Sequence, residues 1–287
     1  MVSVVERFAP SPTGALHLGH AFSALTAWEA AQSAGGTFLL RMEDLDTGRC
    51  RPEFADAIMD DLRHLGLSWP EPVLYQSTRA ADHLKAIEAL MAKGLVYPCF
   101  CTRTEIQAAA GAPQEGDSDG PPYPGTCRDR QRSAAEKPHA LRLDIAKAID
   151  CLGGADAVRA LSFEEIGHGP QGEHGRIGLD PVALTEQIGD VVLRRKDGAV
   201  AYHLAVVLDD ACQGVTHVTR GCDLFPSTPL HRLLQALLDK PTPVYRHHRL
   251  IRDAEGRRLS KRNRDLALSA LRDAGATSAD IRASVGL

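Results

Sequence analysis

Two histidines, His17 and His20, are the first side chains in the sequence whose types and spacing could do chemistry. They stand in RFAPSPTGALHLGH, after a proline-rich turn and at the start of a predicted helix. Residues three apart share a helix face, and the N–H groups and dipole of a helix N-terminus suit phosphate. Gly19 leaves room for a nucleotide to approach. The turn therefore predicts a phosphate site, although HLGH alone is explained equally well by a helix cap with two surface histidines.

Four other polar side chains lie at or near the ends of predicted strands, where open α/β sheets bind ligands. They are Arg7, Glu43, Tyr202 and Arg220. A guanidinium binds a carboxylate through two parallel hydrogen bonds, and a carboxylate complements an ammonium group. The set suits an amino acid, whereas any one of these residues taken alone is better explained by an ordinary surface salt bridge.

Three cysteines, Cys99, Cys101 and Cys127, fall in one short segment. A Cys-x-Cys pair with a distant third cysteine is a moderate zinc signal, weaker than paired Cys-x-x-Cys motifs. A tetrahedral site needs a fourth ligand, and His139 is one candidate within reach in the sequence.

The elements that would position these residues follow from hydrophobic spacing. A strand over residues 3–9, a helix over 16–34 and a strand over 37–41 form a βαβ unit, which predicts a parallel sheet. Further predicted helices cover 55–65, 80–93 and 228–239, further strands cover 199–208, 214–219 and 244–251, and one or two short helices end the chain.

The composition is that of an ordinary globular protein, with 44% hydrophobic and 24% charged residues in a chain of 287. A net charge of −4 argues against indiscriminate coating of nucleic acid and leaves room for a local basic patch, such as Arg194, Arg195 and Lys196. The N-terminus has no apolar stretch that suits a signal peptide or a membrane span. We therefore expect a cytoplasmic protein with no membrane partner.

The His17 segment resembles the HIGH motif of the class I aminoacyl-tRNA synthetases, and RFAPSPTGALHLGH followed by RMEDLD resembles their glutamyl/glutaminyl branch. A second class signature should follow far downstream, and RRLSKR at residues 257–262 resembles it. Its Ser-Lys matches the family pattern, whereas Arg258 replaces the first lysine of that pattern, and the two cations are not equivalent at phosphate sites.

The resemblance implies a Rossmann-like parallel-sheet catalytic domain of the α/β class, with a zinc-containing insertion. About 25 residues follow RRLSKR, so no anticodon-binding domain is expected, and the chain most resembles the stand-alone glutamyl-Q tRNA(Asp) synthetases. That family activates L-glutamate with ATP and Mg²⁺ without tRNA. It then transfers the glutamate to queuosine in the anticodon stem-loop of tRNA(Asp).

The resemblance also assigns roles to individual residues. ATP binding falls to His17, Gly19, His20, Ser260 and Lys261, and catalysis to His17, His20 and Lys261. Glutamate binding falls to Arg7, Phe8, Ala9, Pro10, Ser11, Glu43, Tyr202 and Arg220. The family has Cys-x-Cys and then Tyr-x3-Cys, so one structural Zn²⁺ is expected on Cys99, Cys101, Tyr123 and Cys127.

We predict a division into the first half of the catalytic domain (1–98), the zinc-containing insertion (99–190), the second half with the RRLSKR loop (191–265) and a helical stub (266–287). Three alternatives stay open at this point. They are a truncated glutamyl-tRNA synthetase that charges a tRNA 3′ end, a non-catalytic paralogue that binds nucleotide or tRNA, and an unrelated nucleotidyltransferase.

Overall fold

The structure is a computed structural model that describes residues 3–102, 104–106, 122–128, 138–251 and 267–287. The first strand β1 (Val5–Phe8), helix α1 (Leu18–Ser33) and strand β2 (Thr37–Met42) confirm the predicted βαβ unit. The two strands are parallel, with Val5 opposite Thr37, and β3 (Leu74–Tyr75) pairs in parallel on the other side of β2. The helix buries its Ala, Phe and Leu side chains against this sheet.

A second sheet has the order β7-β6-β10-β9. Its strands are β6 (Ser162–Glu165), β7 (Gly175–Gly178), β9 (His217–Gly221) and β10 (Val244–His248), and only the β6–β7 pair is antiparallel. Strand β9 lies beside β1, where the Thr216 N–H donates to the Val5 carbonyl at 3.0 Å. The carboxyl ends of β1, β2, β9 and β10 therefore open toward one edge of the molecule, the edge at which such sheets bind ligands.

The prediction of a strand over residues 199–208 was wrong. They lead into helix α8 (Tyr202–Cys212), whose residues 204–210 are all buried. A helix enclosed on nearly every side shows no alternation of apolar and polar residues, so a continuous apolar run does not distinguish it from a buried strand. Tyr202 consequently begins a helix instead of ending a strand.

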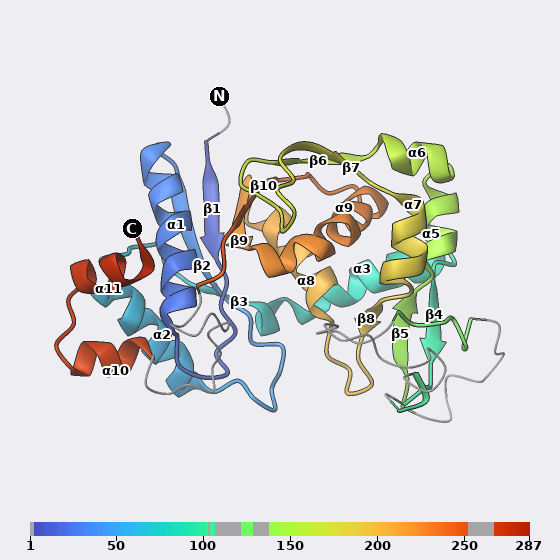
Figure 1. Cartoon of the computed structure of the whole chain (residues 1–287). Coiled ribbons are helices and arrows are strands. Elements are labelled where there is room, and N and C mark those ends of the chain that lie inside the picture. The colour runs from blue at the N-terminus through green and yellow to red at the C-terminus, as the bar shows by residue number, and fades with distance from the viewer. Residues whose placement is uncertain (1–2, 103, 107–121, 129–137, 252–266) are drawn as a thin grey trace.

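The other predicted helices are confirmed with shifted ends as α2 (Pro52–His64), α3 (Ala80–Ala92) and α9 (Thr228–Leu237), with the short 3-10 helices η1 (Gln76–Arg79) and η3 (Cys222–Ser227) before α3 and α9. Two helices close the chain, α10 (Leu268–Asp273) and α11 (Ser278–Val285). They pack against α2 and α1 at one end of the molecule (Figure 1).

The cysteine segment lies at the opposite end, on a separate antiparallel sheet of order β4-β5-β8 (Figure 1). Its strands are β4 (Val96–Cys99), β5 (Ala140–Leu143) and β8 (Val192–Arg194), and α5 (Ile145–Cys151), α6 (Ala155–Ala160), α7 (Pro181–Ala183) and the π-helical turn η2 (Leu184–Ile188) complete this half. Residues 99–190 thus contribute to this sheet and also supply β6 and β7, and the predicted division into domains stays a prediction. Among the helices of the described residues, none combines the length and apolarity that crossing a membrane requires.

Candidate active site

The HLGH turn is held together by its own imidazoles. His17 caps α1, and its Nδ1 accepts the Gly19 N–H at 3.1 Å, while the His17 N–H donates to Nδ1 of His20 at 3.2 Å. The two rings lie 3.9 Å apart between centroids. Because Nδ1 accepts in both rings, each neutral imidazole carries its proton on Nε2 and is a donor there. A Cβ at Gly19 would come within 3.0 Å of the His17 ring, which explains the glycine.

A cavity of about 160 Å³ opens beside this turn. It is lined by Phe8, His17, Gly19, His20, Ser23, Gly221, Asp223, His248, Arg249, Leu250 and Ile251, which come from β1, α1 and the segments that follow β9 and β10. The predicted residues His17, Gly19 and His20 therefore share one small site.

Ser260 and Lys261 lie outside the described residues, but both ends of their segment can be placed. Ile251, at the last described position before it, lines the 160 Å³ cavity. Ala267, the first described position after it, forms an antiparallel bridge with His17, and the Leu268 N–H donates to the Leu16 carbonyl at 2.9 Å. The described residues that flank the second signature on either side therefore lie beside the first signature.

A larger cavity of about 480 Å³ lies between the β1–β3 sheet and β8. It is lined by Ser11, Thr13, Glu43, Leu45, Asp46, Arg49, Gln76, Val192, Arg195, Val200, Ala201, Tyr202 and His203. Three of the predicted glutamate-binding residues, Ser11, Glu43 and Tyr202, line this cavity. Since Phe8 lines the smaller cavity and Ser11 the larger one, the segment after β1 runs from one to the other.

A buried ion cluster joins the charged residues next to this cavity. Asp210 accepts hydrogen bonds from Nε of Arg7 at 3.1 Å and from Nη1 of Arg41 at 2.7 Å, and Arg41 also pairs with Glu43 at 3.2 Å. Burial would raise the pKa of Asp210, but Arg7 and Arg41 outweigh it and hold that pKa below its usual value. Burial raises the pKa of Glu43, against the opposing charges of Arg41 and Arg7. Asp210 thus fixes both guanidinium groups.

Arg7 and Arg220 are buried, and within the described residues neither lines either cavity. Arg220 donates to His247, His231 and Thr228 and lies over the Tyr245 ring. Its charge reaches the cavity wall, because it is the strongest of the charges that oppose the burial-driven rise in the pKa of Tyr202. Of the remaining predicted residues, Pro10 accepts the Glu43 N–H at 2.9 Å through its carbonyl, and Ala9 lies between Phe8 and Pro10.

Sequence reasoning missed several residues that build this site. Arg41 stands in the RMED segment, and Asp210 belongs to an acidic pair at 209–210 that follows the predicted strand 199–208 and has no role in the sequence analysis. His203, His231, His247 and Glu165 carried no motif. Their signal would have been the spatial pairing of distant segments, which a single sequence does not contain.

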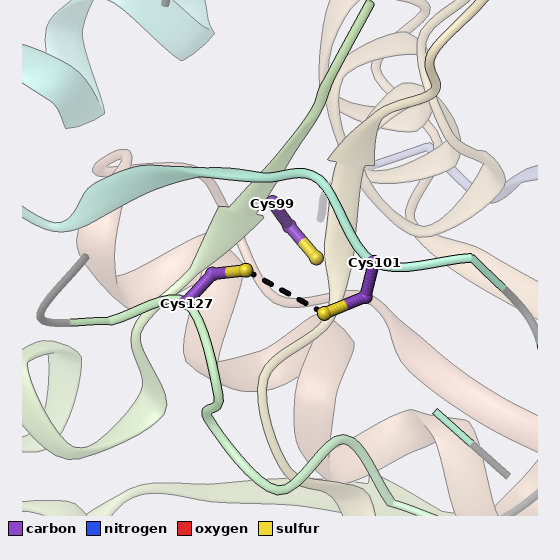
Figure 2. A group of neighbouring side chains, drawn as sticks. All are labelled: Cys99, Cys101 and Cys127. Carbon is purple, nitrogen blue, oxygen red and sulfur yellow. Dashed lines mark hydrogen bonds between the residues drawn. The ribbon is translucent and has the colours of Figure 1, made fainter. Parts of the chain in front are cut away.

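The three cysteines converge in space, as Figure 2 shows. Their sulfurs lie within 4.8 Å of one another, and Sγ of Cys101 and Sγ of Cys127 are 3.5 Å apart. Tetrahedral zinc with Zn–S bonds of about 2.3 Å places sulfurs about 3.8 Å apart, so the cluster fits zinc without large movement.

Tyr123 is the better placed of the two candidates for a fourth ligand. Its hydroxyl lies 3.4 Å from Sγ of Cys101 and accepts the Cys127 N–H at 3.0 Å. Burial raises the pKa of Tyr123, so the phenol is neutral until a cation binds. The Arg142 guanidinium lies 3.9 Å from the ring centroid and would favour a phenolate. In the described part of the chain His139 is not grouped with the three sulfurs and instead contacts the Phe100 ring.

The fold and the histidine turn can now be compared with those of known protein families. The family described as "tRNA synthetases class I (E and Q), catalytic domain" matches residues 3–285. A crystal structure of glutamate-tRNA synthetase from Elizabethkingia anophelis superposes on this chain with a TM-score of 0.70 at 29% identity. The match covers 92% of this chain and 54% of the other.

Relatives over the whole chain are more specific. A glutamyl-Q tRNA(Asp) synthetase of Rhodobacter capsulatus is 49% identical over 99% of this chain and 100% of its own length. Another, from Nitratidesulfovibrio vulgaris, is 43% identical over 96% of this chain and 83% of its own. The chain belongs to the class I tRNA synthetases of the E and Q type and, within them, to the glutamyl-Q tRNA(Asp) synthetase family.

Proposed function

We propose that this enzyme activates L-glutamate with ATP in the absence of tRNA and transfers it to the queuosine base in the anticodon of tRNA(Asp). The observation that carries the first half is the pair of cavities at the two ends of one short segment, one cavity with the histidine turn and one with Glu43 and Tyr202. The segment Phe8–Ser11 joins them, so a nucleotide in one and an amino acid in the other would meet at the end of β1.

In the activation step an α-carboxylate oxygen of glutamate forms a bond to the α-phosphorus of ATP, and the bond to the leaving pyrophosphate breaks. No base is needed, because that carboxylate is ionised at neutral pH. His17 and His20 donate through Nε2 to the phosphate oxygens, Lys261 neutralises charge on the leaving group, and Ser260 contributes to ATP binding. Mg²⁺ bound to ATP supplies further positive charge.

The larger cavity would hold the amino acid. Glu43 receives the ammonium group, with Ser11 and Tyr202 on the cavity wall. Arg7 and Arg220 supply positive charge to the carboxylates from behind that wall, and each is fixed by protein partners. A site so rich in fixed cations favours a substrate with two carboxylates over a neutral amino acid.

One zinc ion on Cys99, Cys101, Cys127 and Tyr123 would stabilise the β4–β5–β8 half of the molecule. Zinc in a closed site of this kind contributes folding free energy and takes no part in the reaction. The position of Tyr123 beside Cys101 and Cys127 supports it over His139 as the fourth ligand.

The transfer step would use an RNA loop held at the mouth of the larger cavity. Arg195 lines that cavity and pairs with Asp197 at 2.6 Å, and it is flanked in the sequence by Arg194 and Lys196. Three successive cations are suited to the phosphates of an anticodon stem-loop, which would compete with Asp197 for Arg195. Since its ATP and tRNA substrates are cytoplasmic, we place the enzyme in the cytoplasm.

The test of activation is pyrophosphate exchange into ATP with glutamate and without tRNA. We expect exchange that depends on glutamate and is not produced by aspartate or glutamine. Absence of exchange at millimolar glutamate would contradict the tRNA-independent activation.

A further inference from the structure

A continuous chain of hydrogen bonds runs behind the amino-acid cavity. It passes from Glu165 through His247, Arg220 and His231 to His203. Four of these side chains are buried, and the fifth, His203, lines the 480 Å³ cavity next to Tyr202. The five residues come from β6, β10, β9, α9 and α8, so the chain connects the second sheet to the helices that cover it.

The hydrogen-bond chain begins at the Glu165 carboxylate, which accepts from the groups around it. One carboxylate oxygen accepts the N–H groups of Gly167 at 2.8 Å and His247 at 2.9 Å, and the other lies 2.5 Å from Nδ1 of His247. Burial would raise the pKa of Glu165, but these hydrogen bonds keep it below its usual value, so the carboxylate is ionised. Nδ1 of His247 therefore carries a proton and donates to Glu165.

The protonation of His247 follows from its other neighbour. A guanidinium has no acceptor, so in the 3.0 Å contact between Nε of Arg220 and Nε2 of His247 the arginine donates. Burial lowers the pKa of His247, and the Arg220 charge lowers it further. Glu165 acts in the opposite direction but does not outweigh them, so the ring is neutral. His247 is thus an acceptor toward Arg220 because Glu165 fixes its tautomer.

The same reasoning fixes the other side of Arg220. Its Nη1 donates to Nδ1 of His231 at 3.2 Å. Burial holds the pKa of His231 well below its usual value, with Arg220 acting in the same direction, so His231 is neutral and its proton lies on Nε2. That group donates to Nδ1 of His203 at 3.0 Å. Because Nδ1 of His203 accepts this hydrogen bond, the ring proton of His203 lies on Nε2, which is a donor.

We propose that His247 and His231 are positioning residues for amino-acid binding, which hold the Arg220 guanidinium between two neutral acceptors. The tautomers that they fix along the hydrogen-bond chain leave a proton on Nε2 of His203, on the cavity wall, which donates a hydrogen bond to a substrate carboxylate. This inference rests on the proposed function, because Arg220 acts here on the amino acid. Carboxylate oxygens only accept hydrogen bonds, so Arg220 and His203 together favour an acid over its amide.

Two substitutions of His247 separate positioning from simple packing. In His247→Asn the amide group reaches the position of Nδ1, so it retains the contact with Glu165 and loses the one with Arg220. In His247→Gln the amide reaches the position of Nε2, so an acceptor for Arg220 remains and the contact with Glu165 is lost. Each variant gives up one buried hydrogen bond, so the two form a matched pair for stability.

The readouts are the Kd for L-glutamate from calorimetry, the KM for ATP and the thermal midpoint. We expect His247→Asn to weaken glutamate binding about tenfold more than His247→Gln, the scale of one hydrogen bond to a charged group, with the KM for ATP unchanged in both. The control is His168→Asn, because His168 is exposed and its backbone N–H donates to the His247 carbonyl at 3.1 Å. A Kd that rises equally in both His247 variants, while their thermal midpoints fall together, would show a purely structural role.

The cavity end of the chain has its own test. His203→Gln retains an N–H donor near the position of Nε2, whereas His203→Ala removes it. We expect His203→Ala to bind glutamate more weakly than His203→Gln, and equal binding by the two would overturn the role of His203.

Measurements on wild-type protein distinguish failure of this inference from failure of the proposed function. Wild-type protein that binds glutamate but does not modify tRNA would contradict the proposed transfer and leave these comparisons intact. Wild-type protein that does not bind glutamate would overturn both. Wild-type binding that His247→Asn leaves unchanged would overturn the inference alone.

Discussion

The cavity beside the HLGH turn, proposed to hold the nucleotide, and the cavity with Glu43 and Tyr202, proposed to hold the amino acid, are built in different ways. The HLGH turn is organised by hydrogen bonds between residues two or three apart, from Gly19 and His17 to the imidazoles of His17 and His20. The cluster beside the amino-acid cavity depends on Asp210, which binds Arg7 and Arg41 from 203 and 169 residues away. Local order suffices to form the histidine turn, although its cavity also needs the ends of β9 and β10. The ion cluster beside the second cavity exists only when the whole domain is folded.

This difference predicts that substitutions in the amino-acid half affect stability and binding together. Asp210→Asn removes the anion shared by two buried guanidinium groups, and stranding such charges costs about 3–5 kcal/mol. We expect that loss in the free energy of unfolding from urea denaturation, together with weaker glutamate binding. Asp156→Asn breaks the exposed ion pair with Arg159 and should cost under about 1 kcal/mol. Similar losses in the two variants would refute the distinction between buried and surface pairs.

Substitutions in the nucleotide half should affect rate instead. Lys261→Ala removes the charge that we propose to contact the phosphates, and it should slow glutamate-dependent pyrophosphate exchange roughly 10²-fold or more. The exposed Lys240, on neither cavity, provides the control Lys240→Ala. An exchange rate within a few-fold of wild type, as expected for Lys240→Ala, would remove Lys261 from the reaction.

The cysteine cluster should affect neither half strongly. Metal analysis of protein prepared without chelator should find one zinc per chain, and Cys99→Ser or Cys127→Ser should abolish it. Exchange activity should fall less than in Lys261→Ala, because the sulfurs belong to the β4–β5–β8 half. Tyr123→Phe should weaken zinc binding, and unchanged affinity would point to His139 or water as the fourth ligand. Protein with no zinc would contradict the site.

The smallest expected effect is a pH dependence at the C-terminal helices. Burial raises the pKa of Asp61 to about 6, although Arg272 pairs with it at 2.8 Å. A carboxyl whose pKa is raised by folding stabilises the fold in its protonated form, and that contribution is lost as pH rises through about 6. Asp61→Asn should therefore gain about 1 kcal/mol relative to wild type between pH 5 and pH 7.5. Parallel stability curves for the two proteins would exclude this.

The comparison also explains how far the sequence could predict the structure. The βαβ unit and the His17–His20 turn follow from local spacing, and they were predicted with errors of one or two residues at their ends. The α8 prediction failed because the continuous burial of residues 204–210 leaves no periodic pattern that would distinguish a helix from a strand. The partners of Arg220 were missed because His231, His247 and Glu165 are brought to it by tertiary packing of α9, β10 and β6. Sequence spacing encodes local geometry, and buried networks of this kind are encoded only jointly by distant segments.

The most direct test of the central claim is where glutamate ends on the RNA. The enzyme is incubated with ATP, labelled glutamate and tRNA(Asp) with or without queuosine, and the product is mapped by nuclease digestion. The proposed function predicts label that requires queuosine, resides in the anticodon loop and survives removal of the 3′-terminal adenosine. Label on unmodified tRNA that is lost with that adenosine would contradict it and establish an enzyme that charges the tRNA 3′ end.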